Sequence, residues 1–249
     1  MASVTAIPPA ALEWLIGPER ASILLVGSAG GYASVLSRAG HSVTVVDPDS
    51  ATLTQFSYSF PRVHTVAAKA ESLPFDPKIF SVVLAIQNFH TFAPGLALGE
   101  WARVLRDEGR VGVGYILRDD SVPWVKKLKR IVQARLPEAM ISEYGTDALS
   151  ALSSSAYFPQ IEKKTYRLWL PSTRVQLQDN ARHAPGAESL PESDLESMLE
   201  EIGELYDQYA RVPDPLQLPY QILCLRAQVD HSTLTTSLIS GEDGLSISL

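Results

Sequence analysis

The first half of the chain alternates short apolar runs with helix-like segments, and this alternation limits the possible folds more than any other feature. Strands are expected at residues 23–27, 42–47, 63–67, 81–86 and 110–117, and helices at residues 32–39, 51–60 and 96–105. Nearly continuous apolar strands are typical of a parallel sheet that is buried on both faces. Because helices separate the strands, the pattern predicts βαβ units and an α/β fold.

The second half of the chain has a different pattern. An amphipathic helix is expected at residues 122–136, and two further strands at residues 160–170 and 218–229. Roughly 45 residues separate these two strands, and they include an acidic helix at residues 192–209. A connection of this length predicts an insertion that serves as a lid or as a wall of the substrate site.

The composition excludes several classes of protein. The 249 residues include 21 basic and 28 acidic side chains, and the net charge of −7 argues against non-specific nucleic-acid binding. Cys224 is the single cysteine and the histidines show no ligand spacing, so we expect neither an internal disulfide nor a metal site. The chain lacks an apolar run of roughly 20 residues and a basic signal region, so we expect a cytoplasmic protein without stable membrane insertion.

A glycine-rich turn and an acidic residue follow the first two expected strands. Gly27 and Gly31 lie in a turn that leads into a helix, where backbone N–H groups can approach a ligand. Asp47 ends the second strand, where a carboxylate can accept hydrogen bonds from both hydroxyls of an adenosine ribose. The pattern favours an adenosine-containing ligand. In the alternative interpretation, the glycines only permit close packing and Asp47 caps the next helix.

The same turn disfavours a dinucleotide cofactor. The fingerprint G-x-G-x-x-G would place its second and third glycines at Ala29 and Tyr32. The second glycine lets the backbone approach the pyrophosphate, and the third permits close packing of the helix on the strand. An NAD-dependent oxidoreductase is therefore a distant alternative.

Three stretches, in this order, resemble the class I S-adenosylmethionine-dependent methyltransferases, particularly the small-molecule branch that includes ubiquinone and menaquinone biosynthesis. They are ILLVGSAGGYASVLSRAGHSVTVVDPD (residues 23–49), AKAESLPFDPKIFSVVLAIQNFHTF (68–92) and EWARVLRDEGRVGVGY (100–115). They look like the cofactor motif with its ribose acid, the adenine-side motif before the fourth strand, and the helix–turn–strand of the fifth. The resemblance covers residues 20–118 closely and the rest loosely.

This resemblance implies a Rossmann-like fold, with a mostly parallel seven-stranded sheet, helices on both faces and an antiparallel last strand. Residues 1–229 would form one methyltransferase-like domain, and residues 230–249 a flexible tail. Within the domain we expect an N-terminal helical segment (1–20), a cofactor-binding core (21–118), substrate-side helices with the sixth strand and the insertion (119–217), and the last strand (218–229).

The resemblance also implies a binding site for S-adenosyl-L-methionine. The implied cofactor-binding residues are Gly27, Ser28, Ala29, Gly31, Asp47, Pro48, Ala70, Glu71 and Gln87. The residues of the glycine turn would line the methionine portion of the cofactor.

The other implied residues would contact the nucleoside or the sulfonium. Asp47 would hold the ribose, and Pro48 would pack beside the adenine. Ala70 and Glu71 would lie near the adenine edge, and Gln87 near the sulfonium.

His90 is the implied catalytic residue. It falls on the second histidine of a His-His pair that is frequent in the family, and Phe89 replaces the first. As a general base, His90 would serve a hydroxyl-type nucleophile. The alternative is a histidine that only borders the pocket or bonds to the backbone.

The chain departs from the family pattern at several positions. Leu25 replaces an acid that contacts the methionine amino group, Ala29 replaces the central glycine, and Lys69 replaces the acid at the adenine amino group. Asp107 and Glu108 replace the Pro-Gly of the turn before the fifth strand. Each lost contact to a charged group would weaken cofactor binding about ten- to hundredfold.

Taken together, the sequence predicts a methyltransferase that transfers a methyl group from S-adenosylmethionine to a small-molecule acceptor by in-line displacement. The alternative is a protein of the same fold that has lost the activity and acts as a binding or regulatory partner. A homodimer is expected only because symmetric dimers are common. The sequence identifies neither the acceptor nor the atom that is methylated.

Overall fold

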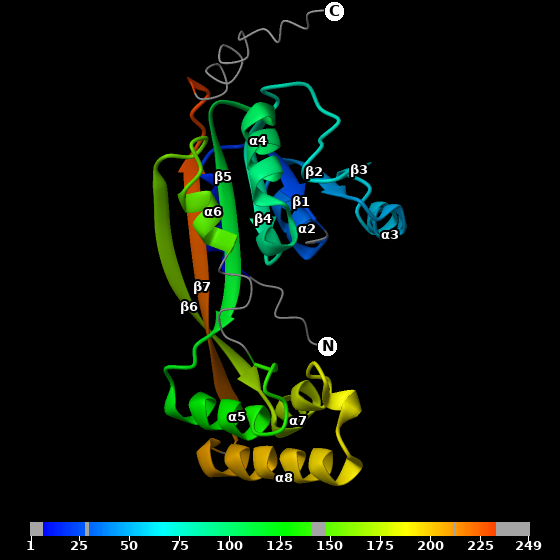
Figure 1. The fold of residues 1–249 in the computed structure, drawn as a ribbon, viewed down its shortest axis with the longest axis vertical. Coiled ribbons are helices and arrows are strands. Elements are labelled where there is room, and N and C mark those ends of the chain that lie inside the picture. Colours follow the sequence, from blue (N-terminus) through cyan, green and yellow to red (C-terminus); the bar gives the residue numbers. More distant parts are fainter. Residues whose placement is uncertain (1–6, 28–29, 141–147, 212, 233–249) are drawn as a thin grey trace, which may run out of the picture. The chain divides into compact units, whose positions relative to one another are not determined.

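The computed structural model describes residues 7–27, 30–140, 148–211 and 213–232 (Figure 1). These residues divide into two compact units. The sheet unit comprises the described residues within Thr5–Tyr115, Gly145–Lys164 and Leu223–Leu249, and the helical unit those within Ile116–Tyr144 and Thr165–Ile222. The expected organisation of residues 1–229 as one domain stays a prediction, and most of the expected tail lies outside the described residues.

The described residues form one seven-stranded sheet with the order β3-β2-β1-β4-β5-β7-β6. The strands are β1 (Ser22–Val26), β2 (Ser42–Asp47), β3 (His64–Ala67), β4 (Phe80–Ile86), β5 (Leu105–Arg118), β6 (Ile161–Ser172) and β7 (Leu216–Gln228). The pairs from β3 through β5 are parallel. This arrangement confirms the predicted Rossmann-like fold.

The last strands run antiparallel, as the resemblance implies. Beyond the end of β7, the N–H of Val229 donates to the carbonyl oxygen of Gly109 near the start of β5, at 2.9 Å. Just after the end of β5, the N–H of Asp119 donates to the carbonyl oxygen of Pro219 in β7, at 3.0 Å. This reversed pairing lets β7 lie beside β5 without a crossover helix.

The strand core of the sheet unit lies in β1 and β4. Every residue of β4 and four of the five residues of β1 are buried. Leu24, Leu25 and Leu84 have no exposed surface. The nearly continuous apolar runs predicted these central strands because both faces of a parallel sheet are covered.

The helices of the sheet unit lie near their expected positions. They are α1 (Pro9–Ile16), α2 (Gly30–Arg38), α3 (Ser50–Ser59), the 3-10 helix η1 (Phe89–Thr91), α4 (Pro94–Val104) and α6 (Leu149–Ser153). Local chemistry sets two of the helix starts. The carboxylate of Asp49 accepts a hydrogen bond from the N–H of Ala51 at 3.0 Å, and Pro94 is the first residue of α4.

The strand expected at residues 110–117 begins earlier, at Leu105. Phe80 pairs with Leu105 and Val82 pairs with Arg110, so the register shifts between these two pairs. The extra residues form a bulge, and Glu108 within it has a positive φ of 63°. Asp107 and Glu108, expected in a turn, therefore lie in an irregular part of β5.

The helical unit contains α5 (Pro123–Gln133), α7 (Arg174–Arg182), the 3-10 helix η3 (Ala187–Ser189) and α8 (Glu192–Tyr209). Buried residues of α5 recur at helical spacing, and they join a core with α7 and α8 that includes Met198 and Ile202. The sequence did not predict α7, whose start has a capping box formed by Thr173 and Gln176. None of the described helices has the length and apolar character of a membrane span.

The core of the sheet unit can be tested at Leu84. Replacing Leu84 by Ala should lower the free energy of unfolding by about 2–5 kcal/mol, because it leaves a cavity in a central strand. Urea denaturation measures this change. Val35→Ala, at a position in α2 that is 45% exposed, is the matched control and should change stability by less than about 0.5 kcal/mol. Equal effects of the two variants would contradict the assigned core.

Candidate active site

The strand order creates a switch point between β1 and β4. From β1 the chain continues to β2 on one side, and it returns on the other side at β4. Ligands of open α/β sheets bind in the crevice at the carboxyl ends of the strands at such a point. Gly27 follows β1, Asp47 ends β2 and Gln87 follows β4, so the topology places these three predicted residues at one edge of the sheet.

Gly27 occupies a position that only glycine fits. Its φ is +76°, and its N–H donates to the carbonyl oxygen of Val46 at 2.7 Å. A Cβ atom at Gly27 would lie 2.1 Å from Nδ2 of Asn88. Asn88 Nδ2 donates to the carbonyl oxygen of Val26 at 2.6 Å, so the amide cannot move away without breaking a hydrogen bond. The first glycine of the turn is therefore required by the contact between the ends of β1 and β4.

Asp47 has a carboxylate with one oxygen available to a ligand. The residue is only 8% exposed, and its Oδ1 accepts a hydrogen bond from the N–H of Asp49 at 2.8 Å. Among the described residues, Oδ2 has no hydrogen-bond partner. Asp49, and not Asp47, caps α3. The alternative interpretation of Asp47 as the helix cap is therefore wrong.

The hydrogen bonds of Asp49 act on its own ionisation. The Thr52 hydroxyl and the N–H of Ala51 donate to the carboxylate and lower the pKa of Asp49. Asp49 thus remains the ionised cap of the helix, and it leaves its neighbour Asp47 available at the sheet edge.

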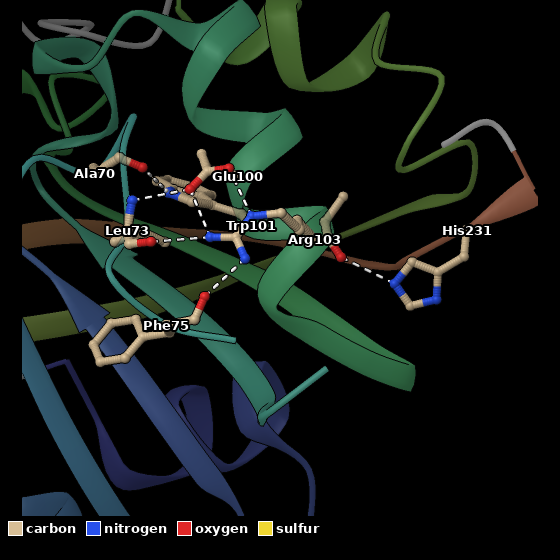
Figure 2. Close-up of polar contacts among 8 residues, drawn as sticks. Ala70, Leu73, Phe75, Glu100, Trp101, Arg103 and His231 are labelled. Atoms are coloured by element: carbon tan, nitrogen blue, oxygen red, sulfur yellow. Dashed lines mark hydrogen bonds and ion pairs between the residues drawn. The ribbon is translucent and has the colours of Figure 1, made fainter. Parts of the chain in front are cut away.

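Ala70 and Glu71 lie in the loop that follows β3, and hydrogen bonds hold both against the start and middle of α4. The carbonyl oxygen of Ala70 accepts from Nε1 of Trp101 at 3.1 Å (Figure 2). Oε1 of Glu71 accepts from the N–H of Ala93, just before α4, at 2.8 Å. The predicted adenine-side residues are thus fixed in place, although their polar groups are partly occupied by contacts within the protein.

A cluster around Arg103 fixes the rest of this loop (Figure 2). Arg103 donates to the carbonyl oxygens of Leu73 and Phe75, at 3.0 and 2.7 Å. Two of its nitrogens donate to Glu100 at 2.8 Å each, and Glu100 accepts from the N–H of Leu73 at 2.9 Å. The hydrogen bond from Arg103 is the main reason that the pKa of Glu100 lies below its ordinary value of 4.5.

His90 lies in η1, after β4, beside the end of β5. Its N–H donates to the hydroxyl oxygen of Tyr115 at 3.0 Å, and its Nδ1 lies 3.2 Å from the same oxygen. Tyr115 is 2% exposed, and burial raises the pKa of its phenol. The hydroxyl therefore fixes both the backbone and the ring of His90 near the switch point.

The other predicted residues are placed in part. Gly31 lies in the first turn of α2, Pro48 is exposed between β2 and α3, and Gln87 is exposed with a φ of +63°. Ser28 and Ala29 lie outside the described residues.

Two of the departures from the family pattern are visible. Leu25 is fully buried inside β1, and Lys69 is exposed in the loop after β3. Neither residue offers the carboxylate that the family places there. Among the described residues, no cluster of His, Cys, Asp or Glu has the makeup of a metal site.

Sequence reasoning missed Asn88 and Tyr115 as parts of this site. Asn88 is the one described residue with a buried side-chain polar atom, Oδ1, that lacks a hydrogen-bond partner. An asparagine directly after an apolar strand was the available signal. Its contact with the carbonyl of Val26, 62 residues away, depends on strand pairing.

The fold and the position of the glycine turn define a Rossmann-like methyltransferase class. Residues 24–113 match the family model described as a methyltransferase domain. The predicted resemblance to class I S-adenosylmethionine-dependent methyltransferases is therefore confirmed. The narrower likeness to the ubiquinone and menaquinone branch stays a prediction.

Relatives support this class. An uncharacterized methyltransferase of Mycobacterium bovis is 27% identical over 188 residues, which cover 70% of this chain and 77% of that protein. An uncharacterized methyltransferase-like protein of Schizosaccharomyces pombe is 34% identical over 122 residues, 48% of this chain and 47% of that protein. A solved structure from Anaeromyxobacter dehalogenans, assigned as a type II methyltransferase, shares the fold with a TM-score of 0.65 at 20% identity, covering 89% of this chain and 96% of that one.

The contact between Gly27 and Asn88 can be tested by substitution. Gly27→Ala should lower the free energy of unfolding by about 1–3 kcal/mol, because it combines a positive φ with a steric clash. Gly95→Ala is the matched control, because a Cβ there meets nothing within 4 Å. A Gly27→Ala protein as stable as the wild type in urea would contradict the geometry.

The Glu100–Arg103 pair predicts a pH dependence of stability. Because the pKa of Glu100 is lowered in the folded state, its contribution is complete above pH 4.5 and is lost as the pH falls through the folded pKa. Glu100→Gln should lower the free energy of unfolding by about 1 kcal/mol at pH 7, since solvent screens the pair on one side. Urea denaturation from pH 7 to pH 3 should show this difference shrinking. A difference that is constant with pH would contradict the assignment.

Proposed function

We propose that this chain is an S-adenosylmethionine-dependent methyltransferase that acts on a small-molecule acceptor. The methyltransferase-domain match and the fold support the class. The cofactor, the acceptor and the site residues are our proposal. It rests on the residues at the carboxyl edge of β1, β2 and β4.

The observation that carries the proposal is the state of Asp47. Its carboxylate is almost buried at the end of β2, and Oδ2 has no partner among the described residues. A nearly buried carboxylate without a second partner is costly unless a ligand donates to it. A ribose hydroxyl is a suitable donor, so Asp47 favours a retained cofactor site over a protein that has lost it.

The residues present fit the cofactor at several points. Gly27 keeps the end of β1 free of side-chain atoms, where the methionine portion would lie. Asp47 would hold the ribose, Pro48 would flank the adenine, and Ala70 with Glu71 would border the adenine edge. When bound, S-adenosylmethionine supplies an electrophilic methyl group on a good leaving group. The task of the protein is to align the acceptor, which can contribute about 7–11 kcal/mol to lowering the barrier.

His90 is proposed as the general base for a hydroxyl-type acceptor. Tyr115 holds its Nδ1, and if Nδ1 carries the proton and donates to the Tyr115 oxygen, then Nε2 is the basic nitrogen. The phenol would thus orient the imidazole as the third group of a base–orienter pair.

The ribose assignment is tested by Asp47→Asn. Calorimetric titration with S-adenosylhomocysteine should show binding weakened about tenfold or more, because the charged acceptor is lost. Asp49→Asn makes the same charge change two residues away and removes the helix cap instead. It should lower stability by about 1 kcal/mol but leave the affinity unchanged. Unchanged affinity in Asp47→Asn, or no binding by the wild type, would refute the proposal.

The role of His90 is tested by His90→Gln. Cofactor affinity should remain, while turnover of a hydroxyl acceptor falls about 10²–10⁴-fold. Tyr115→Phe should lower turnover less, since it loosens the imidazole without removing it. Once an acceptor has been found by screening, single-turnover kinetics separate these effects. Full turnover by His90→Gln would show that His90 only borders the pocket.

A further inference from the structure

A second cavity lies in the sheet unit at the amino ends of the parallel strands. Its volume is about 680 Å³, and residues before β1, at the start of β4 and at the irregular start of β5 line it. The proposed cofactor site lies at the carboxyl ends of these strands. Since β1 has five residues that each rise about 3.3 Å, roughly 16 Å separate the two edges. The cavity is therefore distinct from the site described above.

Three arginines line this cavity without a partner. Arg20, Arg106 and Arg110 make no hydrogen bond or ion pair with any residue in the described ranges. Arg110 is also half-buried. A guanidinium carries five N–H donors in a planar fork that matches a phosphate or carboxylate. Three such groups around one cavity favour an anionic ligand.

Glycines hold two of these side chains in place. Gly17 has a φ of +99°, and a Cβ there would lie 3.4 Å from Nη1 of Arg110. Gly40 has a φ of +93°, and a Cβ there would lie 3.4 Å from Nε of Arg20. Both guanidinium groups thus lie against bare backbone, where part of the ordering cost of binding has already been met.

The acidic residues of the cavity limit which anion would fit. Asp107 is already bound by Lys78 at 2.7 Å and by His231 at 3.0 Å. Glu19 and Glu108 also line the cavity and have no described partner. A ligand must therefore place negative charge at the arginines and hydrogen-bond donors at the two glutamates.

The charge of Arg110 also reaches beyond the cavity, to Glu162. Arg226 already binds the Glu162 carboxylate through two nitrogens, at 2.8 and 3.1 Å. The hydrogen bond from Arg226 is the main reason that the pKa of Glu162 is lowered, and the charge of Arg110 adds to it. Glu162 therefore does not provide Arg110 with a hydrogen-bonded partner.

We propose that this cavity binds a phosphorylated small molecule that also carries hydroxyl groups. The phosphate lies among Arg20, Arg106 and Arg110, and the hydroxyl groups donate to Glu19 and Glu108. The volume lies within the range of about 300–1,000 Å³ that is usual for small-molecule sites. A bare phosphate would fill only part of it. The ligand is an accessory one, since a methyl acceptor has to reach the opposite edge of the sheet.

The test is a titration of the full chain with ribose 5-phosphate at low ionic strength, followed by calorimetry and by amide chemical shifts. Binding should be saturable and should shift residues at the amino ends of β1 and β4, while ribose alone should not bind. Arg106→Gln should weaken binding about tenfold, because one charge-assisted contact is lost. The double variant Arg106→Gln/Arg110→Gln should weaken it further.

Two matched controls separate a built site from general electrostatic attraction. Arg62→Gln removes an equal charge from an exposed position outside the cavity, and Asp47→Asn alters only the proposed cofactor edge. Both should leave the affinity for ribose 5-phosphate unchanged. No saturable binding, equal binding of ribose, or equal weakening by Arg62→Gln would overturn the proposal. Binding of S-adenosylhomocysteine, measured on the same sample, reports separately on the proposed function.

Discussion

The hydrogen bond from Asn88 to the carbonyl of Val26 is the contact on which the site depends. It joins the residue after β4 to the last residue of β1, at 2.6 Å, across the switch point of the sheet. Because the amide fills the space above Gly27, no side chain fits there. The same short segment carries His90, whose ring and backbone contact Tyr115. One amide therefore fixes both the turn expected at the methionine portion and the candidate base.

The adenine side of the site is organised by a different set of contacts. Trp101, Arg103 and Glu100 project from α4 and bind the loop after β3 through its backbone carbonyls and one N–H (Figure 2). Loops that carry function are usually mobile, and these hydrogen bonds hold this one against a helix. At the other end of α4, His231 donates through Nε2 to the carbonyl of Ala102 at 2.9 Å, which ties the segment after β7 to the same helix. The family motif therefore survives here as a scaffold, even though Lys69 has replaced its acid.

Much of the fold could be predicted from sequence because apolar periodicity reports burial directly. The strand at residues 42–47 and the helix at residues 192–209 were predicted at their observed bounds. The helix α7 was missed because only Leu177 and Ala181 are buried, too few to form an apolar stripe. The position of Asp47 followed from spacing along the chain. Asn88 could not be predicted, since its role depends on the register between β1 and β4.

The departures from the family pattern do not remove the site, because they lie beside these anchors and not within them. Leu25 is part of the buried core of β1, and Asp47 keeps an oxygen for a ribose hydroxyl. The most direct measurement is a crystal structure of the full chain with S-adenosylhomocysteine. The account predicts the ribose on Asp47 and the methionine portion beside Gly27. A ligand bound elsewhere, or a site that stays empty at saturating ligand, would contradict it.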